Sequence, residues 1–291
     1  MASETEIAVV GIGCNFPGGE GIDSFWKVIE NGRNCTREIP PEKINIREWY
    51  YPHDNKLGKI RTTHAALLDE FNVFDNKLFG ISNEEAEQMD PRRKLLLECT
   101  YRALEDAGLT TENISGTRTG VFVGLMNQDY EAITSRAASK TDHHDTKGRA
   151  MSTAANQISY TFNLTGPSLV IDTASSSFLS ALHFGYKAIK QGDCEAAVCA
   201  GVHCIIDPGK FVSLCNPKML SPDGRPFSRK GAVYGRGEGC GVLFLKPLIK
   251  VILDTVGGGK QLDQRAPDKG TSRFAMCNKC CLAARKQCMR L

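Results

Sequence analysis

Short apolar runs alternate along the chain with stretches in which apolar residues recur at helical spacing. Five runs predict strands, at residues 7–10, 120–124, 168–171, 196–206 and 241–245. Their residues are apolar throughout and do not alternate with polar ones, so these strands are expected to be buried on both faces. We therefore expect an α/β protein with a layered sheet and helices on both faces.

Helical spacing predicts helices between these strands. The first covers 21–31, and the second covers 89–108, where Asp90 can cap the start, Pro91 takes the first helical position and Gly108 follows the last turn. A third helix begins near Phe178 and ends at Gly192. The polar residues 134–149 are expected to form an exposed loop.

Two glycine patterns invite a binding hypothesis. Gly11 and Gly13 follow the first strand as in a dinucleotide-binding turn, but Phe16 replaces the third glycine and Pro17 fits poorly in a following helix. We favour a turn that ends the strand, and expect no cofactor. The glycines of YGRGEGCG, at 235–241, fall on every second residue and share one strand face. Close packing is the favoured explanation for them, with approach of a substrate as the alternative.

Composition narrows the function classes. The 291 residues are 41% hydrophobic, enough for one large or two small domains, and the net charge of +3 is too small to indicate a nucleic-acid partner. No signal peptide and no membrane-spanning run is recognisable, so a cytoplasmic protein is expected. Eight of the 12 cysteines lie in 1–250 in apolar contexts, which predicts buried free thiols.

The last 41 residues differ from the rest. Residues 251–291 carry a net charge of +5, and residues 1–250 carry −2. Four cysteines lie among the last fifteen residues, at 277, 280, 281 and 288, and the C-x-x-C spacing corresponds to half a zinc site. A tetrathiolate site normally uses two separated pairs, so we expect no metal. We expect a disordered tail after a domain at 1–250.

Three serines stand between a strand and a helix in the segment DTASSSFLSAL, residues 172–182. A group at the start of a helix meets unpaired backbone N–H groups and a partial positive charge, which stabilise a thiolate or an oxyanion. Alternatively, Ser175 or Ser176 caps the helix by accepting an N–H bond. Residue types alone favour the cap.

The surrounding segment resembles the nucleophile region of β-ketoacyl synthases, in which G-P-S and a short strand precede D-T-A-C-S-S. Here Gly166-Pro167-Ser168 precedes Asp172-Thr173-Ala174-Ser175-Ser176-Ser177. Further segments match in order: IAVVGIGCNFPGG, MDPRRKLLLECTYRALEDAG, GVFVG, MLSPDGRPF and YGRGEGCGVLFLKPL. The chain is thus similar to the N-terminal half of a ketosynthase domain of a polyketide or fatty-acid synthase.

The resemblance implies a thiolase-like fold built from two similar halves, usually dimeric. It also implies an acyltransferase whose cysteine takes an acyl group from a carrier-protein thioester. Two histidines of the second half then promote condensation with a malonyl unit. The position that matches the cysteine is Ser175. The expected partners are an acyl carrier protein and a second copy or a full-length synthase.

This chain departs from the family pattern in two respects. A serine hydroxyl is far less acidic than a thiol and needs an adjacent base, whereas His183 lies about 12 Å further along the helix. The family's two histidine motifs have no match, and the resemblance stops near Lys250. We therefore expect impaired condensation. The alternative is a truncated, non-catalytic fragment that binds or dimerises with a full-length synthase.

Overall fold

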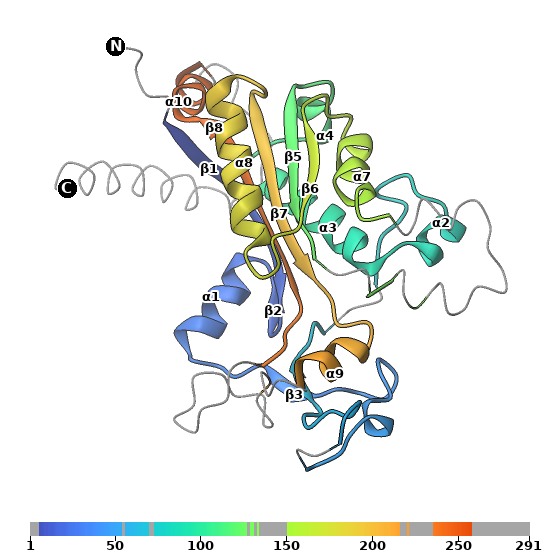
Figure 1. Cartoon of the computed structure of the whole chain (residues 1–291). Coiled ribbons are helices and arrows are strands. Elements are labelled where there is room, and N and C mark those ends of the chain that lie inside the picture. The colour runs from blue at the N-terminus through green and yellow to red at the C-terminus, as the bar shows by residue number, and fades with distance from the viewer. Residues whose placement is uncertain are drawn as a thin grey trace. The chain divides into compact units, whose positions relative to one another are not determined.

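The computed structural model describes residues 6–53, 56–69, 73–126, 129–130, 133, 150–215, 220 and 235–257. Contacts divide the chain into two units, 1–251 and 252–291, and the first is described below (Figure 1). Its strands are β1 (Ile7–Phe16), β2 (Gly19–Glu20), β3 (Thr36–Glu38), β4 (His64–Ala66), β5 (Thr119–Gly124), β6 (Ser168–Ile171), β7 (Ala196–His203) and β8 (Gly239–Pro247). Its helices are α1 (Ile22–Glu30), α2 (Asn83–Gln88), α3 (Pro91–Asp106), α4 (Thr111–Ile114), α7 (Thr153–Thr161), α8 (Ser177–Gln191) and α9 (Gly209–Cys215), with a 3-10 turn at Ile46–Glu48. Helix α10 (Leu248–Gly257) includes residues of both units.

Six strands form one mixed sheet in the order β2-β1-β8-β7-β5-β6. Strand β5 pairs in parallel with both β6 and β7, whereas β8 pairs antiparallel with β7 and β1. Strands β3 and β4 form a separate pair. The carboxyl ends of β5, β6 and β7 therefore lie at one edge of the sheet, where open α/β sheets commonly bind ligands.

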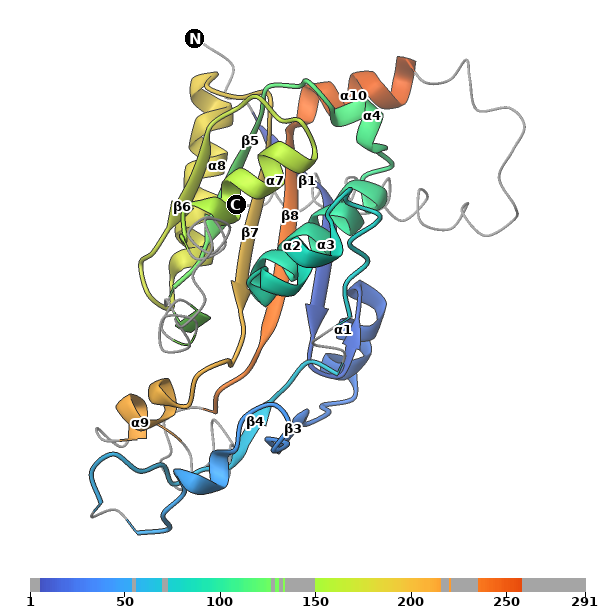
Figure 2. The ribbon, with the colours of Figure 1, turned by 90° about the vertical axis from the view of Figure 1, so that its right-hand side faces the viewer.

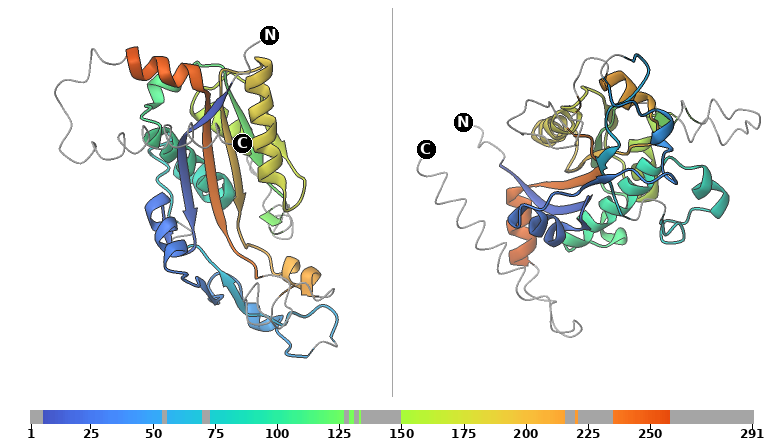
Figure 3. Two further views of the ribbon diagram at one scale, coloured as in Figure 1. Left: turned by 90° about the vertical axis from the view of Figure 1, so that its left-hand side faces the viewer. Right: turned by 90° about the horizontal axis from the view of Figure 1, so that it is seen from below.

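Helices cover the sheet on both faces. Val121 and Val123 of β5 join one buried cluster with α3 and α7, whereas Phe122 joins another with Ala181 of α8. Figures 2 and 3 show α8 on the face opposite α3. Successive side chains of a strand point to opposite faces, so an apolar run such as 121–123 supplies both clusters. The predicted layered α/β arrangement is confirmed.

The interpretation of Gly11 and Gly13 as the end of a strand is wrong. Strand β1 continues through both residues to Phe16 and pairs with β8 along this length. A methyl group on Gly13 would lie 1.9 Å from the carbonyl oxygen of Cys99, and one on Gly11 would lie 2.0 Å from that of Ala103. These glycines allow α3 to lie directly on β1.

The glycines of β8 serve the same purpose on another element. A methyl group on Gly239 would meet the Phe16 ring at 2.5 Å, and one on Gly241 would meet it at 3.3 Å. The close-packing explanation is confirmed at both positions, and the group that approaches them is an aromatic side chain of β1. Phe16, which replaces the third glycine of a dinucleotide fingerprint, is thus a packing residue.

The structure also bears on the predicted helix cap, on the predicted buried thiols and on the length of the helices. Asp90 accepts from the Arg92 N–H at 2.9 Å and begins α3, as predicted. The eight cysteines of 1–250 are free, and all but Cys35 are buried. The predicted loop at 134–149 lies outside the described residues, as do residues 258–291 of the predicted tail, whereas residues 251–257 belong to α10. None of the described helices combines the length and the apolar character that a bilayer span requires.

Replacing Gly13 by alanine should lower the free energy of unfolding by about 3 kcal/mol, because α3 must move away from β1 to admit the methyl group. Gly237→Ala is the matched control, since its methyl group would meet Ala66 at an ordinary 3.5 Å. Urea unfolding followed by circular dichroism measures both variants. Equal stability of the Gly13 variant and the wild type would contradict the packing described here.

Candidate active site

The turn between β6 and α8 is tight and strained. Strand β6 ends at Ile171, and α8 begins at Ser177. Within the turn, Ala174 has a positive φ of 56°, a conformation that an L-residue adopts at a cost of about 1–3 kcal/mol. The Ala174 N–H donates to Asp172 Oδ1 at 2.9 Å, and the Ala174 carbonyl accepts from the Ser177 N–H at 3.1 Å. Bonds on both sides of Ala174 therefore hold the strained residue in place.

The hydroxyls of two of the three serines in this turn form hydrogen bonds with backbone groups. The Ser177 hydroxyl donates to the Ala174 carbonyl at 2.6 Å and accepts from the Thr173 N–H at 3.0 Å. The Ser176 hydroxyl donates to the Thr173 carbonyl at 2.8 Å. Both hydroxyls therefore link the turn to the start of α8 by hydrogen bonds.

Ser175 differs from its two neighbours. It is exposed, and its hydroxyl makes no hydrogen bond with a described residue. It also stands immediately before the first turn of α8, where unpaired N–H groups and the helix dipole favour negative charge. Of the three hydroxyls, that of Ser175 is the one the turn leaves available for chemistry.

The helix-cap hypothesis is wrong in its chemistry. Ser176 does occupy the N-cap position of α8, but its side chain accepts no N–H bond from the helix. Its hydroxyl instead donates backwards to the turn. Ser175 lies outside the helix and caps nothing. The local sequence does not reveal this, because serine can either donate or accept a hydrogen bond.

His183 lies on an exposed part of α8 between the buried residues Ala181 and Gly185. Its ring contacts that of Phe184, with centroids 6.0 Å apart. Eight residues separate His183 from Ser175, about 12 Å along the helix. The prediction that His183 does not serve Ser175 as a base is consistent with this position.

The sequence analysis missed a histidine at the same edge of the sheet. His203 ends β7, and its Nε2 lies 2.9 Å from Arg236 Nη2. The Arg236 guanidinium also lies over the Phe211 ring, 4.7 Å from its centroid. Burial, and then the positive charges of Arg236 and Arg92, lower the pKa of His203 to about 4. His203 is therefore neutral at pH 7.

Two buried carboxylates, Glu238 and Asp129, lie in segments that adjoin the same strands. Glu238 accepts from the backbone N–H groups of Leu68 at 3.1 Å and Ile205 at 2.8 Å, and pairs with Lys43 at 2.8 Å. It thereby joins the segment after β4 to the segment after β7. Asp129 is buried beyond β5, and this burial raises its pKa.

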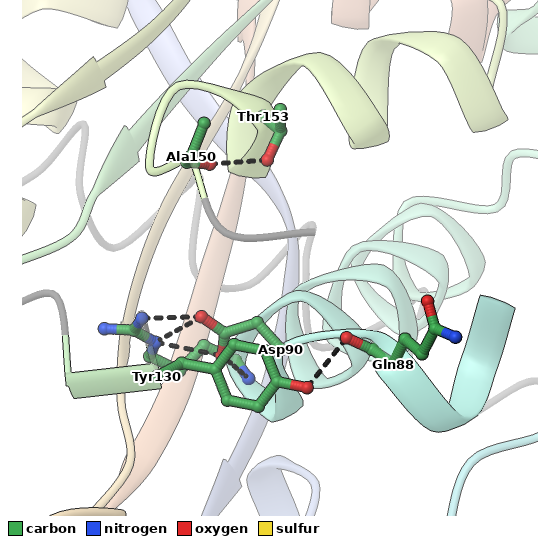
Figure 4. A network of polar contacts seen from close by, with 6 residues as sticks. Gln88, Asp90, Tyr130, Ala150 and Thr153 are labelled. Carbon is green, nitrogen blue, oxygen red and sulfur yellow. Dashed lines mark hydrogen bonds and ion pairs between the residues drawn. The ribbon is translucent and has the colours of Figure 1, made fainter. Parts of the chain in front are cut away.

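A second ion pair fixes the start of α3. Arg92 Nη2 lies 2.5 Å from Asp90 Oδ2, and both side chains are buried. The Tyr130 hydroxyl donates to the Gln88 carbonyl at 2.7 Å beside Asp90 (Figure 4). The segment after β5 is thus tied to the turn before α3. Sequence reasoning identified Asp90 only as a cap, although its ion-pair partner Arg92 lies just two residues further along the chain.

Among the described residues, no group of histidine, cysteine and acidic side chains is arranged to hold a metal ion. Of the described cysteines, Cys14 and Cys199 lack the character of reactive thiols. Burial raises the pKa of Cys14 to about 11 and that of Cys199 to about 12. Thiols so rarely ionised at neutral pH are poor nucleophiles. The available chemistry at this edge of the sheet is therefore an exposed hydroxyl before α8 and a neutral imidazole at the end of β7.

The comparisons with known proteins agree with this arrangement. Residues 4–250 match the β-ketoacyl synthase N-terminal domain, so the chain belongs to the β-ketoacyl synthase family. The reducing polyketide synthase grgA of a Penicillium species is 41% identical over 252 residues, which are 85% of this chain and 10% of that protein. Highly reducing polyketide synthase 40 of Fusarium pseudograminearum is 37% identical over 258 residues, 87% of this chain and 10% of that protein.

Solved ketosynthases have the same fold. The oxazolomycin ketosynthase domain OzmH KS7 of Streptomyces albus gives a TM-score of 0.79 at 34% identity, over 86% of this chain and 44% of that chain. A cysteine-to-serine mutant of the ketosynthase from module 6 of the bacillaene synthase of Bacillus subtilis gives 0.77 at 32% identity, over 85% and 41%. This chain therefore has the thiolase-like fold of a ketosynthase N-terminal domain and spans less than half of either structure.

The neutral state of His203 makes stability depend on pH. Its pKa is lower in the folded chain, about 4, than the usual 6.5, so the unfolded chain binds more protons between these values. Stability from this group is therefore present above pH 6.5 and is lost as the pH falls toward 4. Between pH 7 and pH 5 the wild type should lose about 1–2 kcal/mol more than His203→Asn.

Urea unfolding of both chains at the two pH values measures this difference. The comparison with His203→Asn matters because Asp129, whose pKa is raised, contributes with the opposite sign in both chains. An equal loss in the two chains would show that His203 is not held neutral by its surroundings.

Proposed function

We propose that this chain is an acyl-accepting ketosynthase N-terminal domain in which Ser175 takes the acyl group from a carrier-protein thioester. The observation that carries the proposal is the difference between the three serines. Ser176 and Ser177 are hydrogen-bonded to the turn, whereas the Ser175 hydroxyl is exposed at the start of α8. Membership of the β-ketoacyl synthase family supports the assignment of this position to acyl transfer.

The chemistry of the step is acyl exchange. The Ser175 oxygen bonds to the thioester carbonyl carbon, the C–S bond breaks, and the hydroxyl proton ends on the released thiol. Negative charge develops on the carbonyl oxygen in the tetrahedral intermediate, and the N-terminus of α8 stabilises charge at this point. No oxidant, metal or cofactor is required by this reaction.

Acyl transfer to Ser175 is expected to be slow, because neither His183 nor His203 can act as its base. His183 lies two turns away on an exposed part of α8. The Nε2 lone pair of His203 faces the Arg236 guanidinium, which donates to it, so this nitrogen cannot take up a proton from serine. A serine without a base is a weak nucleophile.

We further propose that these 291 residues do not condense acyl and malonyl thioesters. The six histidines occupy positions 53, 64, 143, 144, 183 and 203, and none lies in an H-G-T-G-T or N-x-G-H motif. The resemblance to the family assigns the decarboxylation of malonyl units to histidines of those motifs. The carrier protein is the proposed partner in acyl transfer.

A second candidate function is binding to a full-length synthase. The outer part of α8 exposes Leu179 at 65%, Phe184 at 49% and Tyr186 at 39%. Apolar side chains gathered on one helix are typical of a surface that contacts another protein. In this case the chain would pair with an intact ketosynthase without carrying out chemistry.

Intact-mass analysis tests the acyl-transfer proposal. After incubation with an acyl-carrier thioester, the wild type should gain the mass of one acyl group, with peptide mapping placing it on Ser175. Ser175→Ala should gain none. Ser175→Cys should be acylated at least about tenfold faster, because a thiol near pKa 8.5 ionises far more readily than a hydroxyl. Neither the wild type nor Ser175→Cys should form a β-ketoacyl product when malonyl thioester is added.

An adduct that persists in Ser175→Ala would overturn the assignment of Ser175. Turnover to a β-ketoacyl product would overturn the claim that condensation is absent. If no adduct forms and the chain elutes with an intact ketosynthase in size-exclusion chromatography, the second candidate function is favoured.

A further inference from the structure

His203 lies on the same face of the sheet as α8. The contacts of β7 show which of its residues face α8. A methyl group on Gly185 of α8 would meet Cys199, and one on Gly201 would meet Phe178 of α8 at 2.8 Å. Residues two apart in a strand share a face, so His203 follows Gly201 on this side. Its neighbours Val202 and Cys204 belong to the cluster on the α3 side, in agreement with this alternation.

The start of α8 lies against the carboxyl end of β7. Helix α8 runs antiparallel to β7, because Phe178 lies over Gly201 whereas Gly185, two turns later, lies over Cys199. Ser175 precedes Phe178 by three residues, and His203 follows Gly201 by two, about 7 Å along the strand. Both residues therefore lie beyond the same helix end.

The hydrogen bonding of His203 determines which nitrogen carries its proton. Arg236 is always protonated and can only donate, so the His203 Nε2 that faces it at 2.9 Å must accept. The single proton of the neutral ring then lies on Nδ1. No described residue accepts a hydrogen bond from Nδ1, and the residue is partly exposed. His203 thus carries an N–H donor of fixed tautomer with no partner among the described residues.

We propose that the Nδ1–H of His203 donates a hydrogen bond to the carbonyl oxygen of the acyl thioester that reacts at residue 175. The proposal rests on the proposed function for the location of the acyl group. As the carbonyl carbon bonds to residue 175 and the C–S bond weakens, its oxygen gains negative charge. A donor aimed at that oxygen stabilises the intermediate without transferring a proton. Arg236 is the positioning residue, because it fixes the tautomer.

The Ser175→Cys chain is the best material for the test, because its reaction does not depend on serine chemistry. In this background His203→Phe keeps an aromatic ring but removes the donor. His203→Asn is the matched variant, because the asparagine amide nitrogen occupies nearly the position of Nδ1 and restores an N–H group. The rate at which an acyl N-acetylcysteamine thioester acylates the introduced thiol is measured by mass spectrometry, together with the midpoint of thermal unfolding.

His203→Phe should slow acylation by roughly 30-fold or more, since loss of one oxyanion donor commonly lowers a rate on the order of 100-fold. His203→Asn should stay within about threefold of the parent, a rescue that a purely structural role would not produce. An unchanged rate in His203→Phe would overturn the proposal, as would equal losses in both variants. An unreactive Ser175→Cys parent would also overturn it, whereas failure of wild-type Ser175 to react contradicts only the proposed function.

Discussion

The close approach of α8 to the sheet is the constraint on which the site depends. At Gly124 and Gly201 the first residues of the helix lie so near the strands that a methyl group would come within 3 Å of Phe178. The chain leaving β6 therefore has little space in which to turn into the helix. It uses a positive φ at Ala174, and the Ser177 hydroxyl closes the turn. Ser175 is presented outward as a consequence of this packing.

Two of the groups at this edge of the sheet offer hydrogen-bond donors. The N-terminus of α8 offers backbone N–H groups, and His203 offers an N–H because Arg236 engages its other nitrogen. An environment of donors stabilises an oxyanion but does not remove a proton from serine. Such a site suits a thiol nucleophile, which needs little help to ionise, better than the hydroxyl of Ser175. This physical mismatch underlies the proposal of slow acyl transfer without condensation.

Features that depend on neighbouring residues could be predicted from the sequence, whereas features that depend on contacts between distant segments could not. The boundaries of α3 followed from Asp90, Pro91 and Gly108, because caps act through bonds to adjacent residues. The strand of residues 168–171 and the position of Ser175 followed from local order in the chain. Gly11 and Gly13 were misinterpreted because their role is to admit α3, a helix far along the chain from β1.

The pairing of His203 with Arg236 was also beyond sequence reasoning. These residues are 33 apart, and they meet only because β7 and β8 pair in a register that places His203 opposite Gly239. The tautomer of His203 depends on that contact. Likewise, the Ser176 hydroxyl donates backwards to the turn and does not cap the helix. The position of the Thr173 carbonyl determines this hydrogen bond.

The central claim is that packing places residue 175, exposed, at the positive end of α8. The most direct measurement is the pH dependence with which iodoacetamide alkylates the introduced thiol of the Ser175→Cys chain, followed on the peptide that contains position 175 by mass spectrometry. The account predicts rapid reaction of the folded chain with an apparent pKa below the usual value of about 8.5. A pKa at or above that value, or reaction only after unfolding, would contradict it.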